Sequence, residues 1–379
     1  MNNKIWLSSP HMGGTEQGYV QEAFDTNWIA PLGPNVNGFE DAIQDYLGQG
    51  KEVAAISSGT AGIHLALILL GIQRDDLVLC QSFTFSASAN PIMYQGATPI
   101  FIDSEKETWN MCPEHLEEAI KDCISNHKKP KAIIAVHLYG MPYKATAIAA
   151  VAQKYNIPVI EDSAEALGST YKNQKCGTFG DISILSFNGN KIITTSGGGA
   201  LVCSSETMKQ KAVFLATQAR DQAPHYEHSH IGYNYRMSNI CAGIGRGQME
   251  VLDKHVALRR EMHFFYKEIF KDVAGVSVFE EPTSEYYSNH WLSAIDIDPS
   301  QTGGVSSKDL MDAFAKANIE SRPLWKPMHL QPVFKNEKYY GNGVAEDLFK
   351  NGLCLPSGSN LNHDDKDRIE KAIFTLFKA

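Results

Sequence analysis

One lysine of this chain stands in a setting that a surface lysine does not need. Lys191 lies in SFNGNKIITTSGGGAL, residues 186–201, among small and hydroxylated residues and just before three glycines. Most lysines are exposed and solvated, whereas a lysine that bonds covalently to a cofactor needs a confined site. We therefore consider Lys191 a candidate nucleophile and the hydroxyl of Ser186 a candidate phosphate ligand.

A second segment, SSGTA at residues 57–61, has the composition of an anion-binding turn. Small residues between a strand and a helix let backbone N–H groups and the helix dipole meet a phosphate. Gly59 and Thr60 are therefore candidate phosphate ligands. A plain helix N-cap by Ser58 or Thr60 explains this segment equally well when it is taken alone.

Two further positions could recognise a flat, basic ring. Phe85, in QSFTF, could stack on such a ring, although a core aromatic is the simpler explanation for a single phenylalanine. A carboxylate of Glu161 or Asp162, which follow the buried segment IPVI, is costly to hide unless it is paired. It could pair with a protonated ring nitrogen, or it could cap the helix that follows.

These four features together describe one ligand. An amine, a phosphate cradle, a stacking aromatic and a carboxylate suit an aromatic aldehyde with a phosphate arm and a basic ring nitrogen. Pyridoxal 5′-phosphate has this structure, and its aldehyde reacts with lysine amines. The residues therefore predict an enzyme that uses this cofactor.

The elements that must position these residues alternate from about residue 52 onwards. Nearly continuous apolar strands separated by amphipathic helices predict an α/β fold, with a mostly parallel sheet covered by helices. Ligands of such sheets bind beyond the carboxyl ends of the strands. We expect strands at 53–57, 76–85, 98–104, 131–140, 157–164, 181–187 and 197–203, and helices at 60–72, 86–95, 113–124 and 145–156.

The pattern changes after about residue 245. A long helix is expected at 247–270, a strand at 291–297, and helices at 306–318 and 363–378. We therefore predict a large cofactor-binding domain at residues 1–245, with an N-terminal segment, and a smaller C-terminal α+β domain at residues 246–379.

Composition narrows the class of partner. The 379 residues carry a net charge of −9, which argues against nucleic acid, because phosphate backbones attract basic surfaces. No apolar run approaches the ~20 residues that span a bilayer, and the first residues lack the features of a signal peptide. Seven cysteines without a CxxC pair indicate reduced thiols and no zinc site. We expect a cytoplasmic enzyme with no membrane or nucleic-acid partner.

Longer segments carry a resemblance to a known family. LSSPHMGGTEQGYV, NWIAPLGPNVNGFE, SFTFSASANPI, EDSAEALGS, SFNGNKIITTSGGGAL, HYEHSHIGYNYRMSN and RPLWKPMHLQPVF resemble segments of the fold-type-I, pyridoxal-phosphate-dependent nucleotide-sugar aminotransferases. The resemblance covers nearly the whole chain. Within the family it is strongest to members of the bacillosamine pathway.

The resemblance implies roles for individual residues. Glu165 matches a position near the 3′-oxygen of the cofactor ring, where relatives have Gln, His or Glu. Asn234, in GYNYRMS, matches an asparagine that reaches the phosphate of the neighbouring subunit, which implies a homodimer with shared active sites. The remaining cofactor positions are covalent attachment at Lys191, the ring nitrogen at Asp162, ring stacking at Phe85, and the phosphate at Gly59, Thr60 and Ser186.

The resemblance also implies the reaction. L-glutamate would donate its amino group to C4 of a nucleotide-linked 4-keto-6-deoxy sugar, best matched by UDP-2-acetamido-2,6-dideoxy-4-keto-glucose. Arg236 is a candidate ligand for a carboxylate or a diphosphate, and an interface salt bridge is an equally good explanation for it. The other predicted substrate-binding positions are Asn27, Trp28, Ile29, Ala30, Gly59, Asn234, His329, Leu330 and Gln331.

Other functions stay open at this point. A GDP- or dTDP-linked sugar would fit the same chemistry, as in perosamine synthesis. Family members that dehydrate their sugar have histidine at the position of Lys191, which disfavours a dehydratase. A nicotinamide-binding protein would carry GxGxxG after its first strand, and this chain does not. His225, His228 and His230 could hold a metal, but a loop lining the sugar site is the better explanation.

Overall fold

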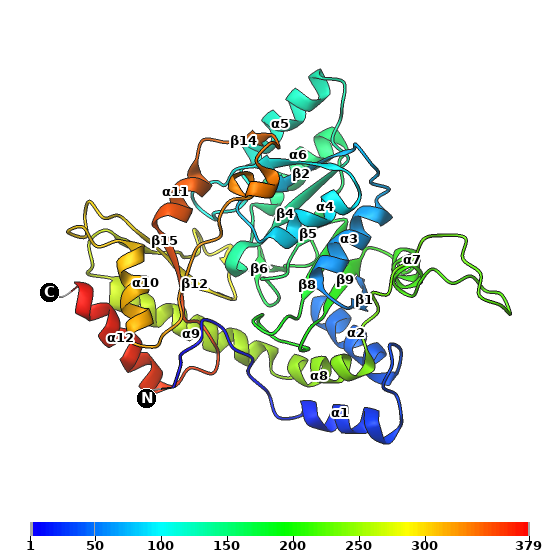
Figure 1. The fold of residues 1–379 in the computed structure, drawn as a ribbon, viewed down its shortest axis with the longest axis horizontal. Coiled ribbons are helices and arrows are strands. Elements are labelled where there is room, and N and C mark those ends of the chain that lie inside the picture. Colours follow the sequence, from blue (N-terminus) through cyan, green and yellow to red (C-terminus); the bar gives the residue numbers. More distant parts are fainter. Residues whose placement is uncertain (1–2, 49, 378–379) are drawn as a thin grey trace.

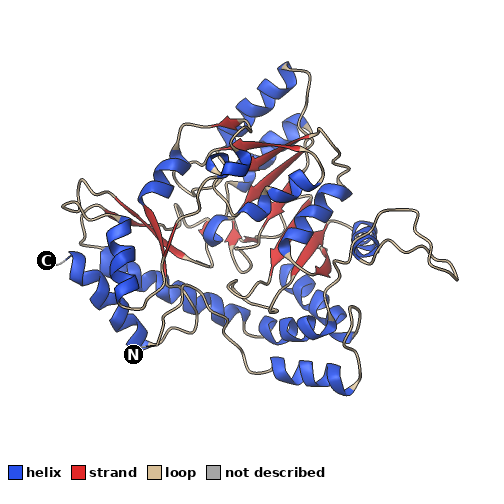
Figure 2. Cartoon of the chain, in the orientation of Figure 1, coloured by secondary structure: helices blue, strands red, loops and turns tan. Residues whose placement is uncertain are grey.

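The large sheet of the protein forms its centre. The computed structural model describes residues 3–48 and 50–377. Figure 1 shows the sheet flanked by helices on both sides, and Figure 2 separates its strands from them. Its eight strands follow the order β1-β9-β8-β5-β4-β2-β3-β14. They are β1 (Glu52–Ile56), β2 (Leu77–Gln81), β3 (Thr98–Ile102), β4 (Ala132–Val136), β5 (Val159–Asp162), β8 (Ile182–Ser186), β9 (Gly199–Cys203) and β14 (Tyr339–Tyr340).

The sheet is mostly parallel, as predicted. Five of its strand pairs are parallel, and only β9 runs antiparallel to its neighbours β1 and β8. The carboxyl ends of β2, β4, β5 and β8 therefore meet at one edge of the sheet. The segments that carried the predicted chemistry follow directly from these ends.

Helices cover both faces of this sheet, because its strands are apolar on both sides. In β1, Ala54 and Ile56 pack into one hydrophobic cluster, while Val53 and Ala55 pack into the opposite one. The first face is covered by α3 (Gly59–Leu69), α4 (Asn90–Tyr94) and α7 (Glu206–Ala216). The other is covered by α2 (Pro34–Leu47), α5 (Pro113–Ser125) and α6 (Ala145–Tyr155).

A second, antiparallel sheet follows later in the chain. Its order is β10-β12-β15-β13, formed by β10 (Val276–Val278), β12 (Ser293–Ile297), β15 (Gly352–Leu355) and β13 (Arg322–Pro323). Its hydrophobic core includes residues of α9 (Leu252–Phe270), α10 (Ser307–Lys316) and α12 (His363–Phe377). This is the α+β arrangement that the sequence indicates after residue 245. The predicted helix end at Lys378 lies outside the described residues.

Two segments cross the expected domain boundary. Near the N-terminus, Ile5 pairs with Ile319 beside the second sheet, and the N–H of Ser357 bonds to the carbonyl of Leu7. In the opposite direction, β14 leaves the C-terminal half and pairs with β3 of the large sheet. The division at residue 245 remains a prediction about folding units.

Some elements differ from the expected ones. The helix expected at 247–270 is two helices, α8 (Asn239–Met249) and α9, because Val251 leaves helical geometry with φ −116° and ψ 6°. The helix expected at 86–95 is a short 3-10 turn, η1 (Ser86–Ser88), followed by α4. Pro91 supplies no N–H to continue the turn into that helix.

The remaining elements are short or peripheral. They are α1 (Glu16–Asp25), α11 (Val344–Asn351), the 3-10 turns η2 (Leu138–Gly140), η3 (Met328–Leu330) and η4 (Pro332–Phe334), and a small sheet of β11 (Tyr286–Tyr287), β6 (Thr170–Tyr171) and β7 (Gln174–Lys175). None of the helices within the described ranges is long and apolar enough to cross a membrane.

Candidate active site

A cavity of about 300 Å³ lies at the carboxyl ends of the parallel strands. Segments that follow β1, β2, β5 and β8 contribute to its wall, which places it where α/β sheets bind their ligands. Seven of the eight predicted cofactor-binding residues line this single cavity: Gly59, Thr60, Phe85, Asp162, Glu165, Ser186 and Lys191. The eighth, Asn234, is exposed and lies outside the lining residues.

Lys191 projects into this cavity from the loop between β8 and β9. Its N–H donates to the carbonyl of Asn188, 3.0 Å away, and its own carbonyl accepts from Arg259 at 3.3 Å. The side chain is only 12% exposed. Its Nζ lies 3.4 Å from Oε1 of Glu165 and 4.0 Å from the ring centre of Trp291. The amine is thus confined between a carboxylate and an aromatic face.

Asp162 is the last residue of β5 and faces the cavity. Its Oδ2 accepts a hydrogen bond from the hydroxyl of Ser88 at 2.7 Å, and its Oδ1 accepts from the N–H of Ala164 at 3.1 Å. The two hydrogen bonds fix the orientation of the side chain. Such a fixed anion can pair with a protonated ring nitrogen.

The neighbouring Glu161 has a different role, because successive residues of a strand point to opposite faces. It is fully buried and lies 2.7 Å from Nε2 of His137, and it accepts hydrogen bonds from Ser183 and the N–H of Gly177. Burial alone would raise the pKa of Glu161, but His137, Ser183 and Gly177 together lower it to about 2. Glu161 thus holds the chain after β7 in place, whereas Asp162 lines the cavity.

Glu165 is the second carboxyl group of the cavity. Burial raises its pKa, while the Lys191 amine and the N–H of Tyr139, 2.7 Å from Oε2, act in the opposite direction. The balance of these effects leaves the pKa of Glu165 above the usual value for a glutamate.

The predicted phosphate cradle is built from glycines. Ser58 caps α3 by accepting from the N–H of Ala61 at 3.1 Å, so the expected N-cap is present beside the cavity. A Cβ added to Gly59 would lie 3.2 Å from Cβ of Ser186, and one added to Gly199 would lie 2.5 Å from the N of Gly59. The close approach of β9 to the start of α3 therefore requires glycine at position 199, the last of the three consecutive glycines.

The cavity suits pyridoxal phosphate in shape and chemistry. The first turn of α3 and the hydroxyls of Thr60 and Ser186 could take the phosphate. Phe85 is 51% exposed and lines the cavity, so it is a free ring face and not a core aromatic; Phe83 is the buried one. The ring of Phe85 lies 5.2 Å from that of Trp325.

A second cavity, of about 730 Å³, adjoins the first. The two share Thr84, Phe85, Asn190, Trp291 and Trp325 in their walls. Gln331, one of the predicted substrate-binding residues, lines this larger space. His329 does not line either cavity. Its Nδ1 lies 2.7 Å from the hydroxyl of Ser82, and its ring stacks on Tyr339 at 3.8 Å. The adjacent Leu330 is 36% exposed.

The structure places Arg236 in a salt bridge within the chain. The side chain is buried, and its guanidinium group pairs with Glu40 and donates to the carbonyl of Ala55 at 2.9 Å. Nη1 of Arg236 is bonded to these two acceptors, whereas its buried Nε has no hydrogen-bond partner among the described residues, and Arg236 does not line either cavity. The ion pair of Arg236 with Glu40 therefore joins the segment before α8 to α2. The segment at 27–30, also expected to face the substrate, is exposed and lies outside both cavities.

Several wall residues were not anticipated. Trp291 and Trp325 come from the C-terminal half, so their approach to Lys191 depends on tertiary structure alone. Ser88 could have been suspected, because it lies three residues after Phe85 and follows a strand end. Asn190 adjoins Lys191 and lines both cavities.

The histidines of the predicted 225–230 loop do not come together. Each is exposed and has its own local partner: His225 lies 2.8 Å from Glu227, His228 bonds to the carbonyl of Gln218, and His230 to the hydroxyl of Ser229.

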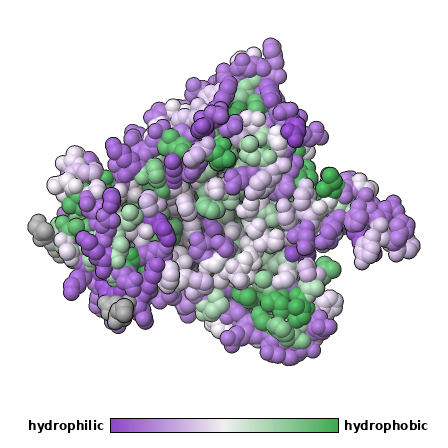
Figure 3. Space-filling model, in the orientation of Figure 1, coloured by the Kyte–Doolittle hydropathy of each residue, from purple (hydrophilic) through white to green (hydrophobic). Residues whose placement is uncertain are grey.

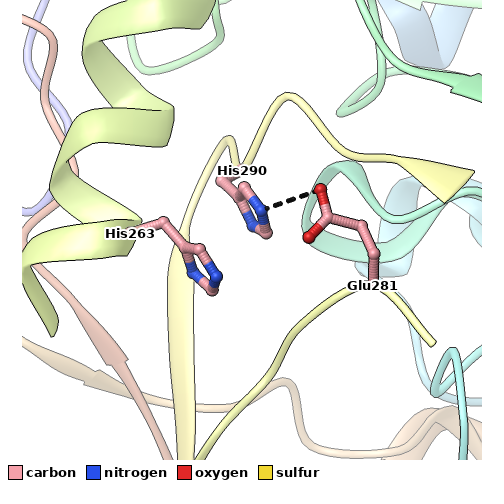
Figure 4. A group of neighbouring side chains, drawn as sticks. All are labelled: His263, Glu281 and His290. Atoms are coloured by element: carbon pink, nitrogen blue, oxygen red, sulfur yellow. Dashed lines mark ion pairs between the residues drawn. The ribbon is translucent and has the colours of Figure 1, made fainter. Parts of the chain in front are cut away.

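A different group, His263, Glu281 and His290, is drawn in Figure 4, with its ligand atoms all within 4.8 Å of one another. Neither ring nitrogen of His263 has a hydrogen-bond partner in the part of the chain that the structure describes. The two imidazole rings, however, stack 3.6 Å apart at an angle of 6°. A metal ion lies near the plane of each imidazole that binds it, and parallel rings cannot both meet this condition. Oε1 of Glu281 is also paired with Arg260 at 2.5 Å. The geometry favours a stacked, ion-paired histidine cluster.

The fold and the cavity together define a fold-type-I enzyme that uses pyridoxal phosphate. The chain belongs to the DegT/DnrJ/EryC1/StrS aminotransferase family, whose sequence model matches residues 10–374. It is thus a pyridoxal-phosphate-dependent sugar aminotransferase, which takes an amino donor and a sugar substrate.

Individual relatives agree with this class. The chain is 51% identical to EpsN of Bacillus subtilis (strain 168), which is named as a pyridoxal phosphate-dependent aminotransferase, over all of this chain and 97% of the relative. It is 38% identical to the GDP-perosamine synthase of Escherichia coli O157:H7, over 95% of each chain. The PLP form of Spr1654 from Streptococcus pneumoniae, named as a sugar aminotransferase, superimposes with a TM-score of 0.89 at 25% identity, covering 99% of both chains.

Proposed function

We propose that the enzyme transfers the amino group of L-glutamate to C4 of a nucleotide-linked 4-keto-6-deoxy sugar, with UDP-2-acetamido-2,6-dideoxy-4-keto-glucose as the acceptor. The observation that carries this proposal is the pair of joined cavities. The smaller one surrounds the Lys191 amine, and the larger one has room for a sugar nucleotide beside it. Lys326 in the larger wall offers positive charge to a diphosphate or to the carboxylates of glutamate, whereas Arg322 in the same wall is paired with Glu320 at 2.7 Å.

Lys191 would hold the cofactor covalently, with Asp162 at the ring nitrogen and the first turn of α3 at the phosphate. Once bound there, the cofactor supplies an electron sink for a carbanion. The free Lys191 amine then serves as the general base that moves the substrate proton, since it stays within reach of it. Asp162 would pair with the ring nitrogen and favour its cationic form. Phe85 would lie against one face of the ring and help to exclude water.

A homodimer is part of this proposal. Asn234 is exposed, but Tyr235 next to it bonds through its carbonyl to the N–H of Ser57, at the edge of the phosphate cradle. In a dimer this position could serve the cavity of the partner. Figure 3 shows hydrophobic residues gathered over α8. Large apolar side chains are also exposed beside it, at the end of α1 and between α1 and α2: Phe24 (60%), Trp28 (49%), Ile29 (38%) and Leu32 (55%). Patches of this kind mark protein interfaces.

The choice of nucleotide has a specific rival. The similarity to a GDP-perosamine synthase supports a GDP-linked 4-keto sugar as a second candidate. A dTDP sugar would fit the same chemistry. Dehydration without amino transfer is disfavoured, because Lys191 is present.

The experiment is an absorbance titration of the purified enzyme loaded with cofactor. Glutamate should remove the visible band of the lysine-bound cofactor, and only the true 4-keto sugar nucleotide should restore it. Restoration by UDP-2-acetamido-2,6-dideoxy-4-keto-glucose alone supports the proposal. Restoration by a GDP or dTDP sugar alone replaces the substrate and keeps the chemistry. A band that does not respond to glutamate would exclude glutamate as donor.

A further inference from the structure

The Lys191 amine lies against the face of the Trp291 indole, 4.0 Å from the ring centre. A cation over an aromatic face is attracted by the ring quadrupole, and more strongly so when water is excluded. We propose that Trp291 is a positioning residue whose indole face stabilises the Lys191 ammonium that forms when the free lysine takes up the substrate proton. This inference rests on Lys191 being the catalytic lysine.

The indole is fixed on several sides. It is 1% exposed, and its Nε1 donates to the carbonyl of Asn190 at 2.6 Å, in the residue next to the lysine. Its backbone N–H donates to Oδ1 of Asn289 at 2.8 Å, and its carbonyl accepts from Arg259 at 2.6 Å. A ring held in this way cannot turn aside when the lysine moves toward or away from it.

Asn289 and Arg259, which hold Trp291, also hold Glu165 and the backbone of Lys191. Nδ2 of Asn289 donates to the carbonyl of Glu165 at 2.9 Å, and Nη2 of Arg259 donates to the carbonyl of Lys191 at 3.3 Å. Lysine, carboxylate and indole are therefore tied together through Asn289 and Arg259. Nothing of this kind would be needed if Trp291 merely filled the core.

Arg259 holds the backbone of Lys191 and Trp291 in place without pairing with a carboxylate of the cavity. Burial lowers its pKa to about 9, so the guanidinium stays charged at neutral pH, and its hydrogen bonds go to backbone carbonyls and a serine hydroxyl. The charged groups around the lysine are thus Glu165 beside the amine, Asp162 across the cavity and Arg259 behind the backbone. The indole is the neutral surface that specifically favours the ammonium.

This placement matters at one stage of the reaction. When the substrate C–H bond breaks, its electron pair stays on carbon and the proton passes to Nζ of Lys191. The amine becomes an ammonium until it delivers that proton. The Trp291 face stabilises this charged stage and keeps the lysine close to its next acceptor. Loss of the face should slow proton transfer without weakening substrate binding.

The test compares Trp291→Phe with Trp291→Leu. Both variants lose the hydrogen bond to Asn190, but only leucine also loses the aromatic face. We expect the leucine variant to transfer the proton roughly tenfold more slowly than the phenylalanine variant in single turnovers with glutamate, because a desolvated contact of this kind is worth about one factor of ten. The KM for glutamate should be the same in both. Cofactor-free Trp291→Leu should also capture added pyridoxal phosphate with a changed rate and pH profile, followed by absorbance.

Two controls separate positioning from stability. Trp109→Leu removes another buried indole from the same hydrophobic cluster; it lines neither cavity and stacks on Phe279 at 3.8 Å. It should lower the thermal midpoint but leave cofactor capture unchanged. Trp291→Met replaces the leucine variant if that chain does not fold. Equal rates for Trp291→Phe and Trp291→Leu, or an effect confined to the thermal midpoint, would overturn the proposal. If Lys191→Ala still captured the cofactor covalently, the assignment of Lys191 would be at fault instead.

Discussion

Gly199→Ala tests whether the phosphate cradle depends on the close approach of β9 to α3. A Cβ at this position would lie 2.5 Å from the N of Gly59, 2.5 Å from the carbonyl carbon of Ser58 and 2.8 Å from the carbonyl oxygen of Leu185. All three are backbone atoms, so a side-chain rotation cannot relieve the clash. Strand β9 and the start of α3 must instead move apart.

The expected loss of stability follows from this overlap. Forcing one extra carbon into a packed interior typically costs about 1–3 kcal/mol, and the absence of a flexible neighbour places this site toward the upper end. The displacement also moves the N–H groups of the first turn of α3, so cofactor affinity should fall together with stability. The assay is urea unfolding of the cofactor-free protein, followed by a titration with pyridoxal phosphate.

Gly197→Ala is the matched control. It lies two residues upstream in the same glycine run, and an added Cβ there would meet nothing within 4 Å. Its unfolding free energy should stay within about 0.5 kcal/mol of the unmodified protein, as for a surface substitution. If the two alanine variants were equally stable, the account of the glycine run as a steric requirement of the cradle would be refuted.

Three further predictions concern charged groups of the site. Lys191→Ala should abolish transamination measured with glutamate, and retained turnover would refute the assignment of the catalytic lysine. Asp162→Asn should lower the turnover rate by about 10²-fold, the usual effect of losing one fixed electrostatic partner; a near-normal rate would mean that another group keeps the ring nitrogen charged. Glu161→Gln should destabilise the fold by about 3–5 kcal/mol at neutral pH, because it breaks a buried pair. The pKa of Glu161 falls from 4.5 to about 2 on folding, so its contribution is present above pH 4.5 and is lost as the pH falls through this window. The unfolding free energy of the glutamine variant should therefore depend less on pH below 4.5 than that of the unmodified protein. An equal dependence on pH in both proteins would contradict this reasoning.

Much of the wall of the smaller cavity could be predicted from sequence, because its residues follow the ends of predicted strands. Gly59, Phe85, Asp162 and Ser186 lie at or just after strand ends, and parallel strands bring those ends to one edge. The periodicity of the strands and helices was enough to place them. The exact strand limits were less accurate, as at Gln81, where the strand ends four residues before Phe85.

The partners of individual side chains could not be predicted in the same way. Arg236 reads equally well as a ligand or as a salt bridge until Glu40, 196 residues earlier, is seen to pair with it. Trp291 carries no signal of its proximity to Lys191, because the contact joins segments a hundred residues apart. The resemblance indicates Asp162, and the structure explains why Glu161 cannot take the same role, since one residue decides which face of a strand each carboxylate occupies.

The pairing of the N-terminal segment with the end of the chain has a consequence for biosynthesis. Ile5 and Leu7 bond to residues 318, 320 and 357, and the hydroxyl of Ser8 donates to the carbonyl of Asn190, beside the catalytic loop. Ile5 and Leu7 thus cannot form these contacts until residues 318, 320 and 357 have been synthesised. Contacts so distant along the chain form late and slowly. A nascent chain could assemble much of its central sheet before those residues emerge, yet the support that Ser8 gives to the lysine loop would be completed only afterwards.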